Sequence, residues 1–408
     1  MLQILKGEVK DAFTNIEAGD ITVGLYDSNQ NHDSVVYKFT PDYYAKTKSD
    51  GSFQFFNLPP KKFTVFGFND KNRNNVYDGE SESVGFLDEK MNIISDTSFI
   101  LNLFNEEPSK IFIRKNFIPY YGIGQIILNK KSKVKLMTLN PNDVANIREQ
   151  RQGEEKDSIS FFYKNLPDTF LLLLKNLSFE KIDTLKFINP RIKKLGKRNM
   201  ISTNIKGNKL PLHQNLTLTF NNWMDTTFRT ERKVSIQEKK DSLWKDVQLK
   251  GRWENLYTYV FTLPQAENKE YKIKMDTLIF KDIYGNWNDS LKAEFKTQSK
   301  TEFGNVILKL SFMTKQKYIL QLMDERNNVF SQKYIGLSLS ESNLKTIDFT
   351  EIPAGNYKVK VIYDDNDNGK WDTGNILKHK QPEHVFISGK QIKILSDWEI
   401  EEEIKVGK

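Results

Sequence analysis

Short stretches in which apolar and polar residues alternate recur along the whole chain. Three clear examples are residues 21–27 (ITVGLYD), 158–163 (SISFFY) and 257–263 (YTYVFTL). A period of two places alternate side chains on one face of a strand, and Val, Ile, Thr and aromatic residues are enriched in strands. Turn residues separate the stretches, as at Asp50-Gly51, where a tight hairpin turn needs a positive φ. The pattern predicts an all-β protein.

The most informative pattern is a repeat shared by the two ends of the chain. Residues 68–80 (FNDKNRNNVYDGE) match residues 362–374 (IYDDNDNGKWDTG) after a shift of 294 positions, which moves Asp70 onto Asp364. The same shift aligns residues of the preceding strands: Phe55 with Phe349, Leu58 with Ile352, Pro59 with Pro353 and Val65 with Val359. One unit, made of a strand, a proline turn, a second strand and a polar loop, therefore occurs twice.

The two copies of the repeat differ in length. The sequence IISD at 93–96 resembles ILSD at 394–397, and 394 − 93 = 301, which is seven positions more than the shift of 294. We therefore expect an insertion of seven residues in the second copy, within residues 373–390.

The length of 408 residues predicts several domains, because one domain usually holds about 100 to 200 residues. We expect four tandem β-sandwiches, at residues 1–104, 105–198, 199–300 and 301–408, in which the fourth repeats the first. The type of the second sandwich stays open. The polar stretch at 140–156 is expected to be an exposed loop or a short helix.

Composition and motifs exclude several function classes. The net charge of +8 comes from 61 basic and 53 acidic residues that are interleaved throughout, which is typical of a solvated surface and not of a nucleic-acid site. Because the chain has no cysteine, it has neither disulfides nor a thiolate metal site. G-x-S-x-G and H-E-x-x-H motifs are missing, and we expect a protein that is not an enzyme.

The repeated loop has the spacing of a cation site. Oxygen ligands at positions 1, 3, 5 and 9 of a tight loop can converge on one ion, and hard oxygen ligands favour Ca²⁺. The residues at these positions are Asp70, Asn72, Asn74 and Asp78 in the first loop and Asp364, Asn366, Asn368 and Asp372 in the second. Glu80 or Glu82 could add a ligand to the first loop and Glu383 to the second.

Calcium binding at these loops would be weak, and an alternative without metal stays open. Position 12, where an EF-hand has a bidentate Glu, is Ser81 in one loop and Asn375 in the other. With two charged ligands in each loop, we expect a Kd on the order of 10⁻⁴ to 10⁻³ M. The alternative is a turn in which the Asp and Asn side chains accept hydrogen bonds from backbone N–H groups.

Two parts of the sequence resemble known families. Residues 216–220 (LTLTF) with Met224-Asp225, residues 271–275 (YKIKM), the D-x-x-G-N turn at 282–286 and FKT at 295–297 resemble the bacterial Ig-like domain named after the S-layer protein SbsA. The G-x-Y-x-V pattern at 355–359 resembles a strand of transthyretin-like and carboxypeptidase-regulatory-like sandwiches. These resemblances imply Greek-key sandwiches of both types.

The combination of an SbsA-type Ig-like domain with transthyretin-like domains at both ends resembles cell-envelope lipoproteins of Bacteroidota. Those proteins begin with a lipoprotein signal and another Ig-like domain, neither of which is found here, so membrane association is expected only through a missing N-terminal anchor. The resemblance implies a periplasmic or surface location at the outer membrane and a non-catalytic scaffold that contacts envelope proteins or surface polymers. Two alternatives are an array of carbohydrate-binding modules, which would use some of the six Trp residues, and an accessory part of an envelope enzyme.

Overall fold

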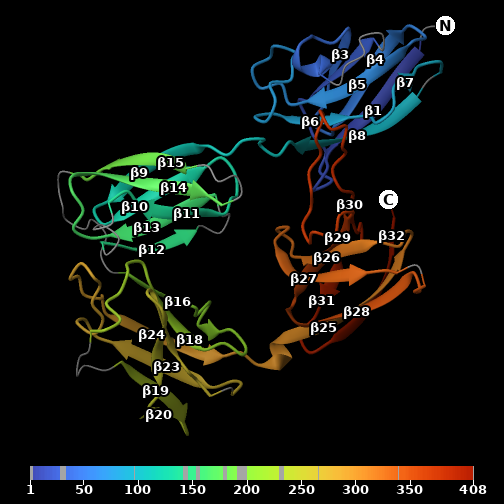
Figure 1. Ribbon diagram of the computed structural model, residues 1–408. Helices are drawn as coiled ribbons and strands as arrows, with labels where there is room; N and C mark the ends of the chain where they lie inside the picture. The colour runs from blue at the N-terminus through green and yellow to red at the C-terminus, as the bar shows by residue number, and fades with distance from the viewer. Residues whose placement is uncertain are drawn as a thin grey trace. The chain divides into compact units, whose positions relative to one another are not determined.

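The chain is built from β-strands, as the alternating sequence pattern predicts. The computed structural model describes residues 3–27, 34–95, 97–140, 146–152, 157–177, 182–190, 200–228, 234–264, 266–338 and 340–407 (Figure 1). Contacts divide the chain into two compact units. One unit holds Met1–Glu107 together with Thr301–Lys408, and the other holds Pro108–Lys300. Over the described residues, no helix has the length and apolar character needed to cross a membrane.

The first module, which comprises β1 to β8, is a sandwich with a main apolar core and a second apolar cluster. Its elements are β1 (Gln3–Asp11), β2 (Thr22–Asp27), η1 (Val35–Tyr37), β3 (Tyr43–Lys46), β4 (Ser52–Leu58), β5 (Lys62–Phe68), β6 (Ser83–Phe86), β7 (Met91–Asn92) and β8 (Thr97–Asn105). The strands pair in the order β3-β2-β5-β6-β8-β1-β4, with β7 beside β5. Alternate side chains of β1, β2, β4 and β5 meet in the core, where Leu5, Val23 and Val65 are fully buried.

The last module, β25 to β32, repeats this strand order in two separate sheets, because the pairing that links β6 to β8 has no counterpart between β30 and β32, whose residues are all described. Its elements are η3 (Lys300–Glu302), β25 (Phe303–Phe312), β26 (Lys317–Met323), β27 (Val329–Gly336), β28 (Leu344–Pro353), β29 (Gly355–Asp364), β30 (Val385–Ile387), β31 (Ile392–Ile394) and β32 (Glu399–Val406). One sheet has the order β28-β25-β32, and the other has the order β27-β26-β29-β30, with β31 beside β29. Each strand takes the place of the strand numbered 24 lower in the first module.

Strand register confirms the internal repeat. In both modules the first strand pairs antiparallel with the fourth strand and parallel with the eighth. The irregularity near the start of the first strand also recurs, between Gln3 and Leu5 in one module and between Gly304 and Val306 in the other. Leu5 lies opposite Phe55 and Val306 lies opposite Phe349, so the residues matched in sequence occupy matching positions.

The other compact unit, Pro108–Lys300, contains two further groups of sheets. The first group consists of β9 (Ile113–Tyr120), β10 (Ile123–Leu128), β11 (Val134–Thr138), β12 (Ile147–Gln152), β13 (Ser158–Tyr163), β14 (Thr169–Asn176) and β15 (Ile182–Ile188). The second consists of β16 (Ile201–Thr203), β17 (Lys209–Leu210), β18 (Leu216–Phe220), β19 (Ser235–Lys240), β20 (Leu243–Asp246), β21 (Gly251–Asn255), β22 (Thr258–Phe261), β23 (Glu270–Met275) and β24 (Leu291–Thr297).

These strands form two pairs of sheets, each around its own apolar cluster. The orders are β12-β13-β10-β9 facing β11-β14-β15, and β16-β18-β22-β21 facing β17-β24-β23-β19-β20. The prediction of a loop or helix at residues 140–156 is wrong for Ile147–Gln152, which forms strand β12. This strand lies at the edge of its sheet, where pairing with β13 sets its backbone conformation.

The D-x-x-G-N turn at residues 282–286 has a structural role. The Asp282 carboxylate is almost fully buried and accepts hydrogen bonds from the backbone N–H groups of Tyr284 and Asn286 at 2.9 and 2.8 Å. Gly285 has a φ of +92°, which a side chain would strain. The Tyr284 hydroxyl in turn donates to the carbonyl oxygen of Gly122 at 2.7 Å, which ties the two groups of sheets together within this unit.

Candidate functional site

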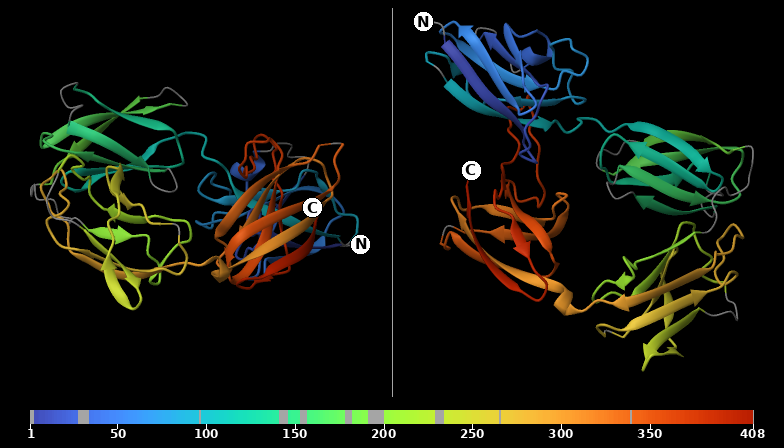
Figure 2. Two further views of the ribbon diagram at one scale, coloured as in Figure 1. Left: turned by 90° about the horizontal axis from the view of Figure 1, so that it is seen from below. Right: turned by 180° about the vertical axis from the view of Figure 1, so that it is seen from behind.

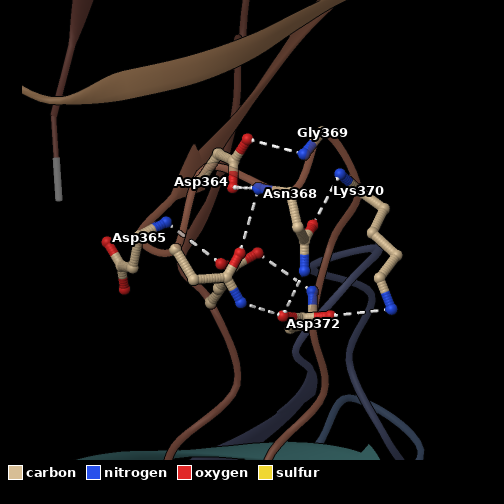
Figure 3. Close-up of polar contacts among 8 residues, drawn as sticks. Asp364, Asp365, Asn368, Gly369, Lys370 and Asp372 are labelled. Carbon is tan, nitrogen blue, oxygen red and sulfur yellow. Dashed lines mark hydrogen bonds and ion pairs between the residues drawn. The ribbon is translucent and has the colours of Figure 1, made fainter.

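The polar loop of the last module is organised by one buried carboxylate. Asp364 ends β29 and is 4% exposed. Its two carboxylate oxygens accept the backbone N–H groups of Asn368 at 3.0 Å and Gly369 at 2.9 Å (Figure 3). Asp372 lies across the loop and accepts a hydrogen bond from the Asn368 amide nitrogen at 2.7 Å. The Asn366 amide also donates to Asp372. All four predicted ligands of this loop therefore lie together.

The loop of the first module has the same contacts. Asp70 accepts the backbone N–H groups of Asn74 and Asn75, each at 3.0 Å. Asp78 accepts the Asn74 amide at 3.3 Å and also the Asn72 amide. In each loop, the backbone N–H groups at positions 5 and 6 thus donate to the carboxylate at position 1. The side-chain amides at positions 3 and 5 donate to the carboxylate at position 9. The structure brings together the predicted residues of each loop.

One buried glutamate braces each loop from behind. Glu383, 3% exposed, accepts the backbone N–H groups of Asp365 at 3.0 Å and Asp372 at 2.9 Å. Glu82, 2% exposed, makes the equivalent bonds in the first module, to Lys71 at 2.9 Å and Asp78 at 3.1 Å. Burial raises the pKa of Glu383, and the nearby carboxylates of Asp372 and Asp364 raise it further. From the sequence we expect both glutamates only as additional ligands, because they lie at different distances from the first loop residue and the repeat alignment therefore does not pair them.

The donor set of each loop suits a hard cation, and it also satisfies a turn without metal. Two carboxylates and two amide oxygens per loop are oxygen ligands of the kind that Ca²⁺ prefers. The amide oxygens already accept backbone N–H groups, such as that of Lys370 at 3.0 Å from Asn368. Among the described residues, no group of three His, Cys, Asp or Glu side chains is arranged to hold a metal ion. Calcium binding stays a prediction.

The positions of Glu82 and Glu383 show where the extra residues of the last module lie. Asp78 and Glu82 are separated by three residues, 79–81, whereas Asp372 and Glu383 are separated by ten, 373–382. The difference of seven is the insertion that the sequence predicts within 373–390. We call residues 373–382 the insert. Within it, Asn375 and Lys380 pair through two backbone hydrogen bonds of 2.7 and 2.9 Å, which close a short turn.

The insert reaches into the first module. Ile376, at its tip, is 1% exposed and packs in a cluster formed by residues of the first module, among them Phe66, Phe86 and Phe104. In Figure 2, right, the red segment that follows β29 runs up to the blue first module. A side chain at Gly374 would meet the Phe104 ring at 2.6 Å, so glycine is required for this close approach.

Polar contacts align the insert on the first module. Thr373 donates its hydroxyl to the carbonyl oxygen of Asn105 at 2.7 Å, and Gln381 donates its amide to the carbonyl oxygen of Phe86 at 2.9 Å. The backbone N–H of Ile376 donates to the Glu106 carboxylate at 2.9 Å. These bonds fix the position of the insert at the ends of β6 and β8.

Glu106 connects the insert to the interior of the first module. It is 7% exposed and also accepts the hydroxyl groups of Tyr37 at 2.8 Å and Tyr77 at 3.1 Å. Burial and the Glu106 charge hold the pKa values of both tyrosines above their usual range, so both remain donors at neutral pH. A buried carboxylate is stable only with such partners, and the insert supplies one of the three.

The first module makes a return contact on the outer face of the last module. Phe13, in the turn after β1, packs with Ile319, Ile362 and Val385, and its ring centroid is 4.9 Å from that of Trp371. Asn15, in the same turn, donates its amide to the carbonyl oxygen of Val385 at 3.0 Å. We call the insert contact and this return contact together the terminal contact.

A buried lysine lies beneath Phe13. The Lys360 ammonium is 3.0 Å from the Phe13 ring centroid, and the residue is 3% exposed. Burial lowers the pKa of Lys360 to about 8, although the Asp11 charge acts in the opposite direction. The cation–π geometry offsets part of the desolvation cost. The terminal contact therefore includes a titratable group whose charge is disfavoured by packing.

The Trp residues of the other unit lie in different environments, which bears on the carbohydrate-binding alternative. Trp223 is buried at 7% exposure and packs against Phe162. Trp253 packs against Phe220 and also lines an open cleft of about 850 Å³. Core packing thus accounts for Trp223, whereas Trp253 has a surface that a ligand could reach.

Comparisons with known proteins assign no family. No family model matches the chain, and no curated protein does. Among solved structures, BcpA, the major pilin subunit of Bacillus cereus, aligns at 7% identity and a TM-score of 0.18 over 100% of this chain and 99% of its own. The four N-terminal Ig domains of Dscam1 isoform 4.4 align at 8% identity and a TM-score of 0.17 over 97% of both chains. The BSP domain of a biofilm-associated protein aligns at 10% and 0.18 over 97% of this chain and 96% of its own.

Proposed function

We propose that the protein is a non-catalytic scaffold of the cell envelope or cell surface whose two ends are fastened to each other. The observation that carries this proposal is the terminal contact, in which the insert of the last module enters the apolar cluster of the first module. Residues 108–300 then form a segment held at both of its ends. Such a segment presents its loops and strand edges to partners, which are envelope proteins or surface polymers.

The terminal contact has the chemistry of a stable interface. Burial of the Ile376 side chain contributes roughly 1.5 to 3 kcal/mol, and each aligned hydrogen bond contributes about 0.5 to 1.5 kcal/mol. Two of the acceptors are the backbone carbonyl oxygens of Asn105 and Phe86, whose strands are held by pairing with their neighbours. The interface therefore needs little ordering before it forms.

Cleavage of the full chain at one connection tests the proposal. A protease site placed between Glu107 and Pro108 divides the chain into residues 1–107 and 108–408, which the terminal contact then joins without a covalent bond. We expect the two fragments to copurify after cleavage. In Ile376→Asp the fragments should separate, because the substitution buries an unpaired charge in an apolar cluster.

The neighbouring residue provides a matched control. Leu377 is 66% exposed, so Leu377→Asp introduces the same charge one position away without entering the cluster. The fragments of this variant should stay together. Separation of the wild-type fragments on native gel filtration would refute a fastened scaffold.

We further propose that the repeated loops bind Ca²⁺ weakly. The support is the oxygen-rich set that each loop brings together, two carboxylates and two side-chain amides at matching positions, because Ca²⁺ prefers oxygen ligands. A ligand bound only by the folded state adds RT ln(1 + [L]/Kd) to stability, about 1.4 kcal/mol at ten times Kd. Calcium at millimolar concentration should raise the melting temperature above that in chelator, and an unchanged temperature would exclude the site.

We infer an envelope location and membership of the Bacteroidota lipoprotein group from the sequence resemblances to SbsA-type Ig-like and transthyretin-like domains. The Asp282 turn supports the Ig-like resemblance, since Asp, Gly and Asn each have a defined role in it. Cell fractionation followed by protease treatment of intact cells tests the location. Recovery in the cytosolic fraction would refute it.

A further inference from the structure

The two sides of the terminal contact belong to modules that have separate cores. The described members of the core cluster of the first module lie between Leu5 and Leu103, and those of the last module lie between Val306 and Val406. Ile376 and Phe13 belong to neither cluster. Opening the terminal contact therefore removes no residue from these two core clusters; it withdraws Ile376 from a second apolar cluster, whose other buried members, between Ala12 and Phe104, all belong to the first module.

The two sides are also prepared before they meet. The insert is held at its ends by the bonds of Asp372 to Glu383 and closed by the pairing of Asn375 with Lys380. In the first module, Glu106 is already fixed by Tyr37 and Tyr77. Complementary surfaces that are formed in advance can bind without first reorganising.

We propose that the same contact also joins separate copies of this chain, so that the insert of one copy enters the first module of another. The partner is a second copy because every group that recognises the insert lies on the first module of the same sequence. The inference rests on the terminal contact of the proposed function and adds that this contact can be exchanged between molecules, which is the physical basis of domain swapping.

The contact between copies is directional. The insert and the surface that receives it differ, so each added copy offers one free insert and one free receiving surface. Such a heterologous contact forms open chains unless a ring closes. Within one chain the two surfaces are linked, which raises the effective concentration at which they meet. Single chains therefore remain closed when dilute, and exchange requires an opened contact or a high local concentration such as that of a crowded surface.

Two full-length variants that each lack one side of the contact test the proposal by complementation. Ile376→Asp disables the insert. Phe13→Lys combined with Asn15→Asp disables the return contact, because the new lysine faces Lys360 and the new carboxylate faces the carbonyl oxygen of Val385. Each variant alone should be a monomer. When mixed, the two variants offer one interface with both contacts intact, between the last module of the Phe13→Lys, Asn15→Asp chain and the first module of the Ile376→Asp chain, and they should form a 1:1 heterodimer by light scattering.

Matched controls and a measured affinity make the outcome decisive. Leu377→Asp and Ile16→Lys change exposed residues beside the two altered sites and should form no heterodimer, since their own contacts stay closed. The Kd of the cleaved wild-type fragments sets the concentration for mixing. A mixture that stays monomeric well above this Kd, with both variants folded by circular dichroism, overturns exchange between copies. Failure of the cleaved fragments to bind would instead overturn the terminal contact itself.

Discussion

Truncation of the insert tip gives a measurable prediction of how strongly the chain ends are joined. Ile376 is 1% exposed in its cluster, and Ile376→Ala removes three buried carbons from that cluster. Ile→Ala changes in apolar cores cost about 2 to 5 kcal/mol, and the short insert can relax toward the space, so the lower end applies. A loss of about 2 kcal/mol weakens binding of the fragments 1–107 and 108–408 roughly 30-fold.

The assay is titration of the cleaved chain, in which one fragment carries a fluorescent label and the Kd is read from anisotropy. Leu377→Ala changes a residue that is 66% exposed and should leave the Kd within about twofold. The melting temperature of the 108–408 fragment should not change in either variant, because Ile376 lies outside the core of the last module. Equal losses for the two variants, or no loss for Ile376→Ala, would refute the assignment of Ile376 as the anchor.

Three further predictions concern the same region and its loop. Burial in the contact lowers the pKa of Lys360 from an ordinary 10.5 to about 8. Below pH 8 the lysine stays protonated on binding, and binding carries the full cost of burying its charge; above pH 10.5 the lysine is neutral in both states and this cost disappears. Fragment binding should therefore tighten as the pH rises from 8 to 10.5, and Lys360→Met should abolish the change. Gly374→Ala should weaken binding, since its Cβ would lie 2.6 Å from Phe104, whereas Gly389→Ala, which meets open space, should not; equal effects would contradict the close-approach argument. Asp364→Asn should remove the part of any calcium-dependent rise in melting temperature that comes from the second loop, and a full rise in the variant would exclude Asp364 as a ligand.

Local patterns in the sequence predict the repeat and the strand content, because both depend on spacing within short stretches. The alternation at 21–27 becomes β2, and the alignment of Phe55 with Phe349 corresponds to equivalent strand pairs. The prediction of a loop or short helix at residues 140–156 is wrong for Ile147–Gln152 because pairing with β13, and not the polar local sequence, determines the backbone conformation there.

The destination of the insert could not be predicted in the same way. Its length difference is visible in the sequence, but its acceptors include the carbonyl oxygens of Asn105 and Phe86, which any residue type provides. Glu106 follows β8 without a surrounding motif, and its role depends on Tyr37 and Tyr77 approaching from other elements. Burial of a carboxylate among aromatic residues becomes recognisable only when the strands are assembled.

The differences between the two copies of the repeat explain why one end of the chain fits the other. The shift of 294 places Phe66 of the first module at the position of Lys360 in the last, so the matching outer faces are apolar in one copy and carry a buried cation in the other. The insert of 373–382 exists in the last module alone, and the first module has three residues in its place. Two identical modules would offer the same surface twice, with no means of choosing an orientation. Because one copy has a projecting segment and the other has an apolar cluster that receives it, the repeat produces a contact with a single direction.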